Sequence, residues 1–219
     1  MKIFLLMCSL IFVFSCANDN EMQTQLNDTK EMSKEMPNQP VIENETDRMF
    51  YEYVNSKEFQ MTDDILKEFI ADLNYTGDFS KIKTKEILFQ WIGSNIISTN
   101  FKDINDAELR WQEFMYLENI EYKKFPAIKG FILNGNIIEV ERVIIKWFPT
   151  GIEITTNSTC RDDFKGCTKN ATSNYLSQMQ LTKEINDIND KANAQSMARL
   201  EFNSAMSDCR NTYKSCVGL

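Results

Sequence analysis

The feature that most constrains this fold is a repeated pattern of cysteines near the C-terminus. Residues 160–167 and 209–216 both read Cys-Arg-x-x-aromatic-Lys-small-Cys. In a helix, cysteines seven residues apart share a face but lie about 10.5 Å apart along the axis, whereas a disulfide needs Cα atoms about 4.4–6.8 Å apart. Each cysteine must therefore pair with the other segment.

An antiparallel helix pair settles which cysteines meet. Facing residues in such a pair have numbers that add to a constant, and Cys160 with Cys216 gives the same sum as Cys167 with Cys209. The sequence therefore predicts these two disulfides in a helical hairpin over residues 158–219. The chain should reverse near residue 188, where Asn and Asp, both turn-forming residues, are concentrated.

The first residues indicate an exported protein, in which an even number of cysteines is typical of disulfides. Lys2 precedes an apolar run over residues 3–14. This run of about twelve residues is shorter than the roughly 20 that a membrane-spanning helix needs. Residues 1–15 are therefore predicted to be a signal peptide that is removed.

The run ends in Val13-Phe14-Ser15-Cys16, which resembles the lipobox of bacterial lipoproteins. The resemblance implies that Cys16 carries a diacylglycerol and an acylated amine, palmitate among its acyl chains, and that cleavage precedes it. Ala17 after the cysteine implies outer-membrane sorting in a two-membrane bacterium, and the acidic start is similar to Bacteroidota or spirochaete lipoproteins. The expected location is the cell envelope, on the periplasmic or the outer face. The alternative is a secretory signal cleaved after Ala17.

Residues 16–46 are predicted to be a lipidated, disordered tether. Residues 17–46 contain no aromatic side chain and carry seven acids against two lysines. Such a segment buries too little apolar surface to offset the entropy of ordering. We expect a helical body over residues 47–157, packed with the hairpin as one domain.

Three helices are expected in the first part of this body. Thr62 is the predicted N-cap of a helix through Ile65, Phe69 and Leu73. A second helix is predicted over residues 80–98. A third should open with a capping box at Asn105 and run to about Lys124.

Residues 126–157 fit two structures. Asn134-Gly135 is typical of a hairpin turn, and the β-branched residues that follow favour strands, which would make the fold α+β with a small β-meander at about 127–157. The helical spacing of Ile137, Val140, Ile144 and Trp147 instead favours a helix, with Asn134-Gly135 as the left-handed cap of a preceding one. The predicted fold is all-α, a helical bundle with a disulfide-stapled hairpin.

Composition excludes several functions. The chain has no histidine, which excludes catalysis by a Ser-His-Asp triad. Its net charge of -8 argues against nucleic acid as a partner. No cofactor or metal motif is present, and no catalytic residue is assigned. The leading hypothesis is a non-enzymatic binding or structural role, with the membrane reached through the lipid and a protein partner in the envelope or outside the cell.

Two alternatives remain open. One is a hydrolase that uses carboxylates, for which the candidates are the acid pairs Asp63/Asp64, Asp162/Asp163 and Glu139/Glu141. The other is an inhibitor or immunity protein, which an exposed, rigid hairpin tip would favour.

Overall fold

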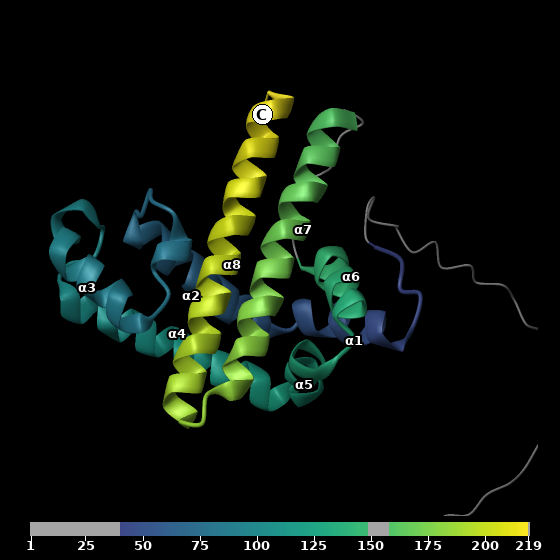
Figure 1. The fold of residues 1–219 in the computed structure, drawn as a ribbon, viewed down its shortest axis with the longest axis horizontal. Helices are drawn as coiled ribbons and strands as arrows, with labels where there is room; N and C mark the ends of the chain where they lie inside the picture. The colour runs from purple at the N-terminus through teal and green to yellow at the C-terminus, as the bar shows by residue number, and fades with distance from the viewer. Residues whose placement is uncertain (1–39, 149–157, 219) are drawn as a thin grey trace, which may run out of the picture. The chain divides into compact units, whose positions relative to one another are not determined.

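The computed structural model describes residues 40–148 and 158–218, and this part of the chain is α-helical with short 3-10 turns (Figure 1). The elements are Glu45–Val54 (α1), Lys57–Leu73 (α2), Phe79–Lys81 (η1), Lys85–Asn95 (α3), Ile96–Ser98 (η2), Ile104–Lys124 (α4), Pro126–Asn134 (α5), Ile137–Trp147 (α6), Ser158–Leu181 (α7), Thr182–Glu184 (η3) and Ile188–Val217 (α8). The described residues belong to one compact unit. The predicted all-α fold is confirmed.

The starts of α2 and α4 differ from the prediction. Ser56 caps α2 by accepting a hydrogen bond from the Phe59 amide, so Thr62 lies inside the helix, buried, with its hydroxyl on the Glu58 carbonyl. Asp103, two residues before the predicted Asn105, caps α4. In both cases a short polar side chain nearer the N-terminus reaches the free amides of the first turn, so the helix starts there.

The predicted helix over residues 80–98 is shorter and is flanked by 3-10 turns. Thr84 caps α3, which is preceded by η1 and followed by η2. The apolar periodicity continues through these turns because they pack on the same core, so the pattern alone overstates the length of the helix.

Residues 126–148 contain the two helices α5 and α6 and no strand, which excludes the β-meander over this range. Residues 149–157 lie outside the described part. Asn136 caps α6 through the Ile138 and Glu139 amides. Gly135 ends α5 as expected, but its φ of -69° is not left-handed. Glycine is needed there for space instead, because a Cβ atom would come within 2.5 Å of the Phe131 carbonyl oxygen.

Helices α7 and α8 form the predicted antiparallel hairpin, and the chain reverses through η3. Asp187 caps α8 by accepting from the Asn189 and Asp190 amides, so the reversal falls where it was predicted. Figure 1 shows the two helices side by side over their length.

Helix α8 takes part in both large apolar cores of the described residues. Met197 and Leu200 pack in the core that α2, α3 and α4 share. Phe202 and Met206 pack in the core that α1, α5, α6 and α7 share. The helix therefore joins the two halves of the body, and Trp111 and Trp147 lie one in each core.

Candidate functional site

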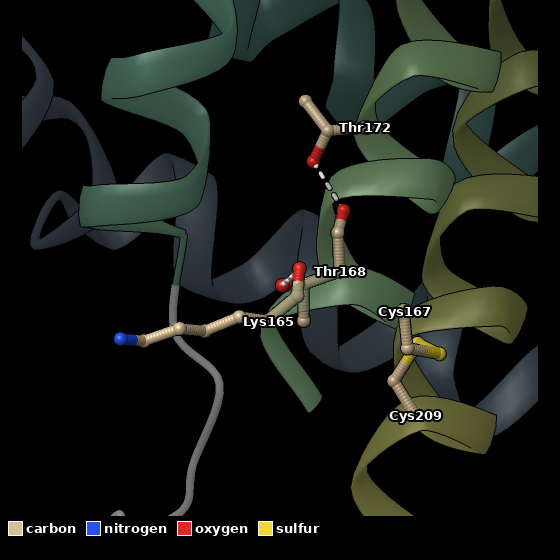
Figure 2. The surroundings of a disulfide bond; sticks show 5 residues. All are labelled: Lys165, Cys167, Thr168, Thr172 and Cys209. Atoms are coloured by element: carbon tan, nitrogen blue, oxygen red, sulfur yellow. Dashed lines mark hydrogen bonds between the residues drawn. A yellow bond between two sulfur atoms is a disulfide. The ribbon is translucent and has the colours of Figure 1, made fainter. Parts of the chain in front are cut away.

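The two predicted disulfides are present. Cys160 is bonded to Cys216 and Cys167 to Cys209, with Cα atoms 5.9 Å and 5.7 Å apart. Figure 2 shows the inner bond between the two helices. Cys16, the predicted lipid attachment site, lies outside the described residues.

The disulfides lie in what we call the stapled arm, residues 159–168 of α7 and 209–217 of α8. Its small core contains Cys160 and Cys209 with Phe164 and Tyr213, whose ring centroids are 5.2 Å apart, and Cys167 and Val217 pack against it. Among the described residues, only α7 and α8 contribute to this core. Two helices bury too little apolar surface to hold each other, so the disulfides supply stabilisation that packing against a third helix would otherwise provide.

Two threonine side chains of α7, next to the inner disulfide, form hydrogen bonds within the helix. Thr168 donates to the Lys165 carbonyl at 3.1 Å, and Thr172 donates to the Thr168 carbonyl at 2.8 Å (Figure 2). Both threonines are buried, and these bonds satisfy their hydroxyls within the helix.

A buried ionic cluster lies between α1, α4 and α8. Arg199 donates from Nη1 to both carboxylate oxygens of Glu121, at 3.0 Å each, and Glu118 Oε1 lies 3.5 Å from the same nitrogen. The hydroxyl of Tyr53 donates to Glu121, and that of Ser196 donates to Glu118. Since Arg199 is 3% exposed and Glu121 is fully buried, the cluster is held inside the protein.

The cluster contains two carboxyl groups and one guanidinium, and burial is the largest influence on the pKa values of its groups. Burial, with the Glu121 charge, raises the pKa of Glu118 against the opposing effects of Arg199 and Ser196. Burial lowers the pKa of a guanidinium, but the charge of Glu121 keeps that of Arg199 above its usual range. Burial also raises the pKa of Tyr53, and it raises that of Tyr175 to about 12. These tyrosines therefore act as neutral hydrogen-bonding groups.

Sequence reasoning missed this cluster. Glu118 and Glu121 are three residues apart, a spacing that places both on one face of α4, but acids so spaced are usually solvated. Arg199 stands between Ala198 and Leu200 in an apolar stretch of α8, which was the one available signal. The guanidinium also lies over the Phe59 ring at 5.5 Å, so the cluster links α2 to the other three helices.

Another buried acid, Asp47, connects the start of α1 to α6. Lys146 donates to its Oδ2 at 2.6 Å and Trp147 donates to its Oδ1 at 3.2 Å, while Arg142 lies 2.9 Å from Oδ1. Burial alone would raise the pKa of Asp47. These bonds, together with one from the Glu43 amide, outweigh burial and hold the pKa of Asp47 well below its usual range.

The three acid pairs proposed for a hydrolase do not come together. Asp63 is paired with Lys67 at 2.5 Å, while Asp64 is exposed. Asp162 and Asp163 are both exposed on the stapled arm.

The third pair is similarly engaged at the surface. Glu139 binds Arg142 through two hydrogen bonds, and Glu141 accepts one from Ser173 at 3.5 Å. None of the six acids lines a described cavity.

A cavity of about 430 Å³ lies between the segment at residues 80–83, the C-terminal half of α7 and the N-terminal half of α8. Its apolar wall includes the buried side chains of Ile82 and Met197. Gln178 and Glu201 both line it and are bonded to each other, with Gln178 Nε2 donating to Glu201 Oε2 at 2.6 Å. The remaining lining residues are Ser80, Lys83, Asn174, Ser177, Leu181, Thr182, Ile185 and Ala194.

Within residues 40–148 and 158–218, no group of three or more cysteine, aspartate or glutamate side chains is placed to hold a metal ion. None of the helices described is both long and apolar enough to cross a membrane. No protein-family model, no curated protein and no solved structure matches the chain.

Proposed function

We propose that the mature protein is a lipid-anchored envelope protein with a binding role rather than an enzymatic one. The observation that carries this proposal is the pair of disulfides between α7 and α8. Disulfides form and persist in oxidising compartments, which fits export by the predicted signal peptide. The lipobox-like sequence ending at Cys16 then supplies the attachment to the membrane.

The placement of the acids favours binding over hydrolysis. A glycosidase needs two carboxyl groups flanking one cleft. Here the buried acids Glu118, Glu121 and Asp47 are engaged with Arg199, with Lys146 and with neighbouring hydroxyl groups in the interior. These acids link helices, and the cavity beside Glu201 offers a place for a ligand.

Lipidation is tested by metabolic labelling with a palmitate analogue, comparing the wild type with Cys16→Ala. The wild type should be labelled and remain with the membrane fraction, whereas the variant should be unlabelled. Labelling of both, or release of the wild type into the medium, would contradict the proposal.

Protease treatment of intact cells then assigns the face. Loss of the protein from unbroken cells places the body outside the cell, and protection until lysis places it in the periplasm. Tryptic mapping without reductant checks compartment and pairing together, because a chain kept in the cytoplasm would show all four hairpin cysteines as free thiols.

An inhibitor or immunity role is the second candidate, and the reversal between α7 and α8 favours it. Ile188 is 81% exposed there, next to the cap that Asp187 makes, and Lys191 donates to the Lys183 carbonyl across the same reversal. A photo-crosslinker at position 188 should capture an enzyme whose activity falls when the purified protein is added. Ile188→Asp should abolish this inhibition, while Thr212→Asp, at an exposed site on the stapled arm, should not.

A further inference from the structure

The cavity between residues 80–83, α7 and α8 has the size and the mixed lining of a ligand site. Binding cavities for small molecules are typically about 300–1,000 Å³, apolar over most of the wall, with a few polar groups that orient the ligand. This one measures about 430 Å³. Its apolar side chains come from all three walls: Ile82, Leu181, Ile185, Ala194 and Met197.

The cavity walls carry two opposite charges, Glu201 and Lys83, that do not form an ion pair with each other. Glu201 accepts one hydrogen bond, from Gln178, and this bond leaves its Oε1 without a described partner. Lys83 lies on the opposite segment and has no carboxylate within ion-pair distance among the described residues. A ligand that carries an ammonium and a carboxylate would complement both charges at once.

The helix α7 adds amide groups to the same rim. Asn174 and Gln178 are four residues apart, so they lie on one face of the helix, and both line the cavity. A side-chain amide offers a donor and an acceptor, the same pair that a peptide group offers. The rim is thus suited to hydrogen bonds with a peptide backbone, and the wall below it to aliphatic side chains.

We propose that this cavity binds a short peptide of aliphatic residues with free termini. Its ammonium group lies at Glu201, its carboxylate at Lys83 and its backbone along Asn174 and Gln178. This inference rests on the proposed binding role and names the class of ligand.

Calorimetric titration of the purified, oxidised mature protein with trileucine tests the assignment. Trileucine should bind, and triglycine should not, because it lacks the apolar side chains. Acetylating the amine or amidating the carboxylate should each weaken binding about tenfold, the loss of one charge-assisted hydrogen bond.

Two variants tie each terminus to its residue. Glu201→Gln should weaken trileucine about tenfold but leave acetylated trileucine unchanged, and Lys83→Gln should do the same for the amidated peptide. Glu184→Gln and Lys81→Gln are matched controls, since both side chains are exposed and outside the cavity lining. Thermal melting of every variant establishes that the fold is retained.

Several outcomes would overturn the proposal. They are no heat with trileucine at millimolar concentration, equal binding of free and capped peptides, or loss of binding in the controls. Binding of a fatty acid that depends on Lys83 but not on Glu201 would assign the cavity to an acyl chain instead. Failure with trileucine leaves the labelling and shaving results intact, so the ligand and the envelope role are judged separately.

Discussion

The stapled arm predicts a particular energetic relation between its two disulfides. The bonds span sequence separations of 56 and 42, so they form two steps of a ladder. When the inner bond is present, the outer one closes only a ring of sixteen residues, eight from each helix. The two bonds therefore constrain the unfolded chain together, and removing one relieves only part of the constraint.

Loop-closure entropy gives the magnitudes. Either bond alone stabilises the fold by about 4 kcal/mol, and adding the second contributes about 3 kcal/mol more, the value for a ring of about 15 residues. Replacing either pair with alanine should then cost about 3 kcal/mol, and replacing both about 7 kcal/mol. The double loss exceeds the sum of the single losses by about 1 kcal/mol because each bond compensates for the other.

Denaturant unfolding of Cys160→Ala/Cys216→Ala, Cys167→Ala/Cys209→Ala and the variant that lacks all four cysteines measures these costs. Hydrogen exchange should show faster exchange in the four-alanine variant at residues 159–168 and 209–217, with residues 171–206 still protected. A four-alanine variant that loses less than the sum of the two pairs, or that exchanges uniformly, would refute the reasoning.

Three further predictions concern the buried charges. Glu118→Gln should raise the unfolding free energy by about 1 kcal/mol at neutral pH, because it removes the excess carboxylate. Since the pKa of Glu118 is raised in the folded state, the wild type should lose stability as the pH rises above about 4.5 through the folded-state pKa. A pH series of denaturant melts should show no such loss in the variant. Arg199→Met should cost about 3–5 kcal/mol by leaving Glu121 buried without its cation, measured in the same melts, and an unchanged midpoint would contradict the burial argument. Asp47→Asn should cost about 3 kcal/mol of unfolding free energy at neutral pH, because it weakens the contact with Lys146. Since the pKa of Asp47 is lowered in the folded state, the wild type keeps this stabilisation above about pH 4 and loses it at lower pH. The unfolding free energies of the two proteins should therefore become equal in acid.

Helix boundaries show where local patterns mislead. Thr62 looked like a cap because acids and an apolar stripe follow it, yet the helix had already begun at Ser56. A threonine inside a helix can satisfy its hydroxyl on the carbonyl four residues earlier, as Thr62 does with Glu58, so its polarity does not mark a boundary. Helix α4 likewise begins earlier than predicted, because Asp103 rather than Asn105 is its N-cap.

The sequence by itself determined the hairpin, its disulfides and its point of reversal, because a helix has a fixed rise and a disulfide a short reach. It also favoured helices over residues 126–148, through the spacing of apolar side chains. Only the tertiary structure decided which charges are buried, since Glu118, Glu121 and Arg199 come from segments 78 residues apart. Whether a carboxylate meets water or a guanidinium depends on which helices pack together, and no local pattern carries that information.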